Sequence, residues 1–136
     1  MTTERIFPYG ERELEALCSA DPVLGEYIGV VGRIERGTHP HLFEELVRSI
    51  IAQQISGKAA VTVSRRVEDL LGVVTPERLL GTDPAVLQQC GLSFRKVGYL
   101  RGIAAEAAAG RLDQQEMSQL SDEEIVRRLS ALSGVG

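Results

Sequence analysis

Two glycines near the end of the sequence, Gly134 and Gly136, have the type and spacing of a phosphate-binding turn. They flank Val135 just after an apolar helical pattern that runs to Leu132. Glycines leave backbone N–H groups free to face a phosphate at the start of a following helix, so the pattern is typical of the opening of a helix-hairpin-helix element. A glycine-rich cap after any helix gives the same residues. Both interpretations stay open on this segment alone.

A second unusual segment, Gln53-Gln54-Ile55-Ser56, joins two strongly apolar helical patterns. Side chains on such a short, rigid corner can enter a DNA minor groove, fill the space left by an extruded nucleotide and hydrogen-bond the base that has lost its partner. The alternative is a tight corner between helices, in which Ile55 packs against a helix capped by Ser56 and both glutamines are solvated.

The elements that must position these segments are predicted to be helices, so the expected fold class is all-α. Capping side chains precede a proline at three predicted helix starts, and a capping box marks a fourth: Asp21-Pro22, Thr75-Pro76, Asp83-Pro84, and Ser121 to Glu124. Apolar residues recur at helical spacing in residues 42–51, 60–71, 97–107 and 125–132. Short joints between these stretches predict a compact multi-helix bundle that ends inside the hairpin.

Charge is distributed unevenly along the chain. The net charge of −4 argues against a nucleic-acid partner. Residues 46–111, however, hold 9 basic and 5 acidic side chains, whereas residues 1–45 hold 4 and 9 and residues 112–136 hold 2 and 5. The basic middle permits a surface that follows phosphates, and a solvated helix face gives such a count as well.

Composition excludes several classes of protein. The 136 residues predict a single soluble globular domain, with no apolar run of transmembrane length and no signal peptide, so we expect no membrane partner and a cytoplasmic location. Cys18 and Cys90 lie far apart, and only His39 and His41 accompany them as candidate ligands. We therefore expect no metal, no other cofactor and no disulfide, and interpret both cysteines as core thiols.

Three segments together resemble one family: FEELVRSIIAQQIS at residues 43–56, GLSFRK at 91–96 and LSGVG at 132–136. In this order and at these separations they are similar to the helix-hairpin-helix DNA glycosylase superfamily, in its 3-methyladenine DNA glycosylase II (alkylpurine) branch. The resemblance covers roughly residues 17 to 136. It implies base-excision repair: the protein bends double-stranded DNA containing alkylated bases, flips an alkylated purine into a cleft and cleaves its N-glycosidic bond.

The resemblance also implies a single catalytic aspartate, since alkylation already makes the base a good leaving group and one carboxylate suffices. The family places that aspartate beyond the hairpin, after Gly136. None of the aspartates at residues 69, 83, 113 and 122 matches its position. We therefore expect a C-terminally truncated chain that is inactive alone. The alternatives are a finished, non-catalytic helical DNA-binding or protein-interaction module, and a fragment complemented by a separate C-terminal chain.

What the family pattern carries over is DNA binding. Gln54 takes the intercalating position, with Gln53, Ile55 and Ser56 beside it, and Gly134, Val135 and Gly136 form an incomplete hairpin. Ser93, Arg95 and Lys96 match a segment where a helix begins, so the helix N-terminus and two cations could meet a phosphate. In the alternative interpretation, Gly91 caps the helix before it and the cations are solvated.

Two parts of the chain are expected from the same pattern. Residues 1–38 form an N-terminal helical segment that belongs to a second lobe, whose other helices follow the hairpin in the family. Residues 39–136 form the helical bundle. Without those helices, apolar residues of the first segment lack partners, so we expect self-association through this surface, exchange onto a neighbouring chain, or poor order.

Overall fold

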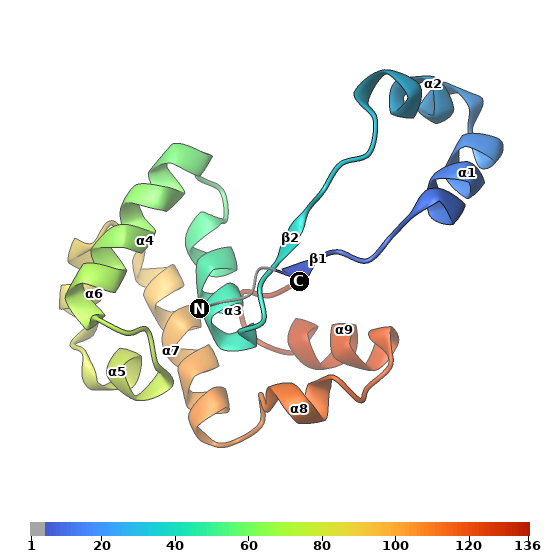
Figure 1. Cartoon of the computed structure of the whole chain (residues 1–136). Helices are drawn as coiled ribbons and strands as arrows, with labels where there is room; N and C mark the ends of the chain where they lie inside the picture. The colour runs from blue at the N-terminus through green and yellow to red at the C-terminus, as the bar shows by residue number, and fades with distance from the viewer. Residues whose placement is uncertain (1–4) are drawn as a thin grey trace. The chain divides into compact units, whose positions relative to one another are not determined.

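The computed structural model describes residues 5–136, and the chain divides into two compact units, Met1–Pro40 and His41–Gly136 (Figure 1). We refer to them as unit 1 and unit 2. Helices make up nearly all of the regular structure in the described residues, so the fold is all-α as predicted. No helix in this part of the chain is long and apolar enough to cross a membrane.

Unit 1 is a helical hairpin closed at its base by two very short strands. The helices α1 (Glu11–Ala20) and α2 (Pro22–Val31) pack together, and β1 (Arg5–Ile6) pairs antiparallel with β2 (Gly37–Thr38). Asp21 starts α2 as predicted, because its carboxylate accepts hydrogen bonds from two backbone N–H groups of the first turn. The two strands were not predicted, because a strand of two residues is too short to show an alternating apolar and polar pattern.

The two helices of unit 1 approach closely at Gly25. A β-carbon placed there would lie 3.2 Å from the Cα atom of Cys18, so glycine allows this contact. Cys18 itself is only half-buried, and its interpretation as a core thiol is wrong. No described residue of unit 1 is fully buried, because the unit has no further layer of its own to cover the apolar side chains of its helices.

Unit 2 contains seven helices within the described residues, arranged around α7 (Phe94–Ala108). This helix packs against α3 (Leu42–Ala52), α5 (Pro76–Gly81) and α6 (Pro84–Gln89), and α4 (Gly57–Leu71) packs on α3. The short α8 (Gln114–Met117) and α9 (Asp122–Ser130) complete the unit (Figure 1). The final helix therefore ends two residues before the predicted Leu132.

The core of unit 2 combines the predicted apolar faces of α3, α4 and α7 with residues of α5 and α6 that were not predicted, whereas the predicted face of α9 contains no fully buried residue. Its largest fully buried side chains are Ile50, Ile51, Val67, Leu79, Leu87, Val97, Leu100 and Ile103. Cys90 belongs to this core, and burial raises the pKa of its thiol. The predicted N-caps are also present: Ser56, Thr75, Asp83 and Ser121 each accept a hydrogen bond from the first turn of the helix that follows.

Candidate nucleic-acid interface

One hollow of about 550 Å³ in unit 2 collects side chains from three segments that are distant in the sequence. It is lined by Gln53, Gln54, Ser93, Arg95, Lys96, Tyr99, Gly134, Val135 and Gly136. The segments are the corner between α3 and α4, the start of α7 and the end of the chain. Eight of the ten residues predicted to bind DNA line this hollow; Ile55 and Ser56 lie on the same corner but not in its lining.

The corner after α3 reverses the chain through an unusual backbone conformation. Gln54 has φ of 58°, and no other non-glycine residue in the described chain has a positive φ. A side chain in this left-handed region costs of the order of 1 kcal/mol, so surrounding contacts must hold it there. The conformation leaves Gln54 exposed at the edge of the hollow, followed by Ile55, whose side chain is 39% exposed.

Lys96, in the first turn of α7, supplies one of those contacts. Its Nζ atom donates hydrogen bonds to the carbonyl oxygens of Ile51, at 2.8 Å, and Gln53, at 2.6 Å. The last carbonyl groups of a helix have no partner within the helix, and a cation there also opposes the negative end of the helix dipole. The ammonium group thus closes the end of α3 at the point where the corner begins.

Gln53 connects the corner to the glycine-containing end of the chain. Its Nε2 atom donates a 2.7 Å hydrogen bond to the carbonyl oxygen of Gly134. Gly134 has φ of 86°, and a β-carbon there would lie 2.4 Å from the ring of Tyr99. Only glycine satisfies both the backbone conformation and the contact with the ring, so this turn is fixed against α7 as well as against the corner.

At the start of α7, Ser93 and Arg95 have different situations. The Ser93 hydroxyl accepts a hydrogen bond from the backbone N–H of Lys96, so it acts as the helix N-cap. Arg95 is exposed, and it has no hydrogen-bond or ion-pair partner within residues 5–136. Gly91, with φ of 107°, adopts the positive φ expected of a residue that ends the preceding helix.

Sequence reasoning missed Tyr99 and the partners of several cations. Tyr99 follows Lys96 by three residues, which places both on one face of α7, and this spacing was the available signal. Arg78 and Arg101, counted in the basic middle of the chain, donate to carbonyl oxygens at the ends of α4 and α5. Counting basic residues therefore overstates the charge available to a phosphate.

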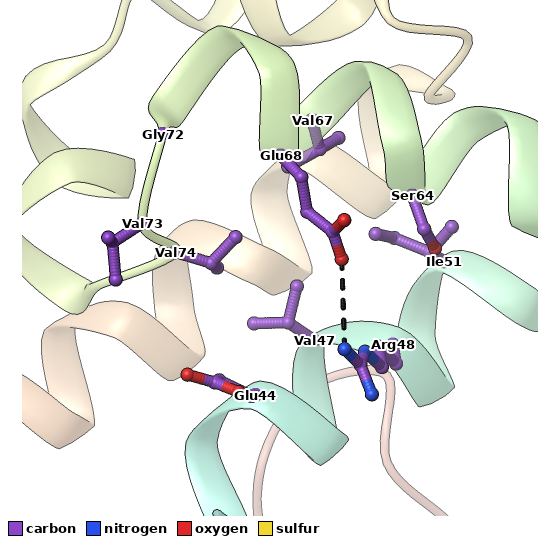
Figure 2. A pocket seen from close by; sticks show the side chains of 10 residues that line it. All are labelled: Glu44, Val47, Arg48, Ile51, Ser64, Val67, Glu68, Gly72, Val73 and Val74. Atoms are coloured by element: carbon purple, nitrogen blue, oxygen red, sulfur yellow. Dashed lines mark ion pairs between the residues drawn. The ribbon is translucent and has the colours of Figure 1, made fainter. Parts of the chain in front are cut away.

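A second hollow, of about 270 Å³, lies between α3 and α4 and contains none of the predicted residues (Figure 2). Figure 2 shows Arg48 facing Glu68 across it. The guanidinium and the carboxylate are 3.7 Å apart. Arg48 also pairs with Glu45 at 3.3 Å. Exposed pairs of this kind contribute little to stability, and they leave the hollow as a groove at the junction of two helices.

None of the nine residues lining the hollow at the corner is acidic. The lining offers amide groups, a guanidinium, backbone N–H groups and the positive end of a helix dipole. These groups bind anions and can hydrogen-bond a base, but the lining contains no carboxylate side chain that could orient water. Within residues 5–136 no cluster of His, Cys, Asp or Glu could hold a metal ion either.

Comparison with known proteins gives a consistent result. A sequence profile of the HhH-GPD superfamily base excision DNA repair proteins matches residues 47–135. DNA-3-methyladenine glycosylase 1 of Schizosaccharomyces pombe is 33% identical over 98 residues, which are 69% of this chain and 43% of that protein. DNA-3-methyladenine glycosylase of Saccharomyces cerevisiae is 33% identical over 104 residues, 69% of this chain and 35% of that protein.

Solved structures agree. DNA-3-methyladenine glycosidase from Bacillus halodurans matches 97% of this chain with a TM-score of 0.81 and 34% identity, and this covers 62% of that protein. The S. pombe 3-methyladenine DNA glycosylase in complex with abasic DNA matches 92% of the chain with a TM-score of 0.80 and 27% identity, covering 64% of that protein. The chain thus spans less than two thirds of the length of each of these relatives.

Proposed function

Because this chain belongs to the HhH-GPD superfamily of base excision DNA repair proteins, we propose that it is the DNA-engaging part of an alkylpurine DNA glycosylase. The observation that carries the proposal is the hollow itself. Residues near positions 54, 95 and 135 are far apart in sequence, yet they line one hollow with groups suited to DNA. A relative solved with abasic DNA supports the same partner.

In this proposal the lining binds the two features of a DNA strand from which a base has been flipped. The backbone N–H groups at the end of the chain, the start of α7 and Arg95 contact phosphates. Gln54 enters the minor groove and fills the space of the extruded nucleotide, where its amide hydrogen-bonds the base left without a partner. Ile55 adds an apolar side chain beside the opened step.

The chemistry of the proposed whole protein is hydrolysis of the N-glycosidic bond of an alkylated purine. Alkylation makes the base an activated leaving group, so a single carboxylate that stabilises the developing sugar cation and orients water is sufficient. The hollow in unit 2 has no acidic residue in its lining. We therefore propose that residues 1–136 bind damaged DNA but do not release bases by themselves.

Two assays on the 136-residue chain test this function. It should bind a duplex with an abasic site more tightly than an intact duplex of the same sequence. Base release from methylated DNA should stay within about tenfold of the rate without protein, equivalent to about 1.4 kcal/mol of activation free energy. Equal affinity for both duplexes would contradict recognition of the space left by a missing base. Faster base release would show that a residue within this chain performs the chemistry.

We also propose that the chain self-associates through α2. Val23, Tyr27 and Val30 follow helical spacing on one face of α2, and their side chains are 63%, 67% and 87% exposed. Contiguous exposed apolar side chains favour association, since contact removes their surface from water. Light scattering after size exclusion should show a dimer or larger species that Val30→Lys converts to a monomer. A monomeric wild-type chain would contradict this part of the proposal.

A further inference from the structure

The contact that distinguishes Lys96 from its neighbour Arg95 is its pair of hydrogen bonds to the end of α3. Both residues lie in the first turn of α7 and line the same hollow. Arg95 is exposed and has no partner within the described residues, whereas Lys96 is half-buried and donates to the carbonyls of Ile51 and Gln53. The two cations at the start of α7 therefore differ in burial and in hydrogen bonding.

The Gln53 carbonyl is the important acceptor, because it belongs to the peptide unit that leads into Gln54. A hydrogen bond of 2.6 Å to this oxygen fixes the orientation of that peptide plane. The φ angle of Gln54 is measured from the same plane, and its value of 58° is the unfavourable one. The Lys96 ammonium therefore acts on the backbone conformation that presents Gln54.

A second bond acts on the same residue from the opposite segment. The Gln53 side chain donates to the Gly134 carbonyl at 2.7 Å, so the peptide and the side chain of Gln53 are both restrained. The Gln54 side chain has no hydrogen-bond partner within residues 5–136 and stays exposed. The neighbours thus hold its backbone while leaving its side chain free to contact DNA.

We propose that Lys96 is a positioning residue, which holds the Gln54 backbone in the conformation required for gap recognition, rather than a phosphate contact. The ammonium has three N–H donors, and two of them already bind carbonyl oxygens in the chain. A phosphate contact would compete with these bonds. This inference rests on the proposed function, since it concerns how the chain recognises a duplex with an extruded or missing base.

The test compares Lys96→Met with Arg95→Met in the 136-residue chain. Both changes remove one positive charge from the same helix turn and keep an unbranched apolar stem. Binding is measured to an intact duplex and to the same duplex with one abasic site, each over a range of salt concentrations. The ratio of the two dissociation constants gives the gap preference, and the slope of log affinity against log salt concentration gives the number of phosphates neutralised.

The proposal predicts opposite results for the two variants. Lys96→Met should lower the gap preference at least about fivefold and leave the salt slope on intact duplex unchanged. Arg95→Met should weaken binding to both duplexes equally and reduce the salt slope by about 0.9. If Lys96→Met instead behaves like Arg95→Met, Lys96 contacts a phosphate and the proposal is overturned.

A double-mutant cycle with Gln54→Gly shows whether Lys96 acts through Gln54. Glycine adopts a positive φ without strain and carries no side chain to enter the gap. In the Gln54→Gly background, Lys96→Met should change the gap preference by less than about twofold. The same loss as in the wild-type background would overturn the proposal, because Lys96 would then act independently of Gln54.

Two controls keep the outcome interpretable. Circular dichroism and thermal melting show whether Lys96→Met folds, and Lys96→Gln replaces it if it does not. The neutral amide of glutamine can still donate to a carbonyl oxygen. An unchanged salt slope for Lys96→Gln supports the proposal, and a slope reduced by about 0.9 overturns it. A wild-type chain without any gap preference contradicts the proposed function. A wild-type preference that Lys96→Met leaves intact contradicts the positioning role alone.

Discussion

The two units of this chain use similar local signals and reach very different degrees of burial. In unit 1, Asp21 caps α2, but no described residue of the unit is fully buried. In unit 2 similar caps start helices whose apolar faces form one continuous core. Helix formation therefore follows from caps and periodicity in both units. Burial requires a further layer, which unit 2 contains and residues 5–40 of unit 1 do not.

The site belongs to the well-packed unit. Its corner follows α3, which contributes Leu46, Val47, Ile50 and Ile51 to the core. Its other lining residues come from the start of α7 and from residues 134–136. The proposed entry of Gln54 into DNA would benefit from such rigid support. Unit 1 offers exposed apolar surface but no comparable packed core. The two units therefore differ in how precisely they can position a side chain, as well as in stability.

The largest expected effect compares the stability cost of truncating one leucine in each unit. Leu100→Ala, at a fully buried position in unit 2, should lower the free energy of unfolding by about 2–5 kcal/mol, because it removes apolar contacts and leaves a cavity. Leu24→Ala in unit 1, where the side chain is 40% exposed, should cost less than about 1 kcal/mol. Urea unfolding of both variants measures the difference. Similar losses would mean that Leu24 is as well packed as Leu100.

A smaller effect is expected at two glycines of unit 2 with similar positive φ angles. Gly134→Ala should destabilise the chain by about 2–4 kcal/mol, because its new methyl group meets the Tyr99 ring at a positive φ. Gly110→Ala has φ of 79° but no atom within 4 Å of the new carbon, so about 1 kcal/mol of backbone strain is its whole cost. Thermal unfolding of the pair isolates the contact with the ring. Equal shifts would show that the Tyr99 contact is unimportant.

Much of this arrangement could be predicted from the sequence, because local physical rules determine it. Proline and capping side chains gave the starts of α2, α5, α6 and α9, and apolar spacing gave the core faces of α3, α4 and α7. The fold also brings together three segments that were predicted to act together, at residues 53–54, 93–96 and 134–136. Whether they bind DNA stays a prediction.

Other features depend on contacts between distant segments, and the sequence does not specify those contacts. Lys96 and Arg95 are adjacent cations in the sequence, and only the fold directs one to α3 and leaves the other exposed. Gln53 reaches Gly134 across 81 positions of the chain. The half-burial of Cys18 likewise depends on what covers α1, which no pattern within α1 reveals.

The smallest expected effect concerns a surface ion pair of unit 2. Arg111 donates to both carboxylate oxygens of Glu106, and this hydrogen bonding lowers the carboxyl pKa below its ordinary value. A lowered pKa in the folded state stabilises the fold above the ordinary pKa, and the contribution is lost as pH falls through the lowered value. Glu106→Gln should therefore melt at a slightly lower temperature than wild type at neutral pH, and this difference in melting temperature should disappear in acid or high salt. A melting-temperature difference that persists in acid would show that the ion pair between Glu106 and Arg111 is not its cause.

The most direct test of the account is the gap preference of Gln54→Ala. In the proposed function the α3–α4 corner presents Gln54 to the space left by a missing base, so this variant should lose about 1–3 kcal/mol of binding to a duplex with an abasic site and almost none to the intact duplex. Fluorescence anisotropy at one fixed salt concentration measures both affinities. An equal loss on the two duplexes, or no loss on either, would show that the corner only connects two helices and would contradict the central claim.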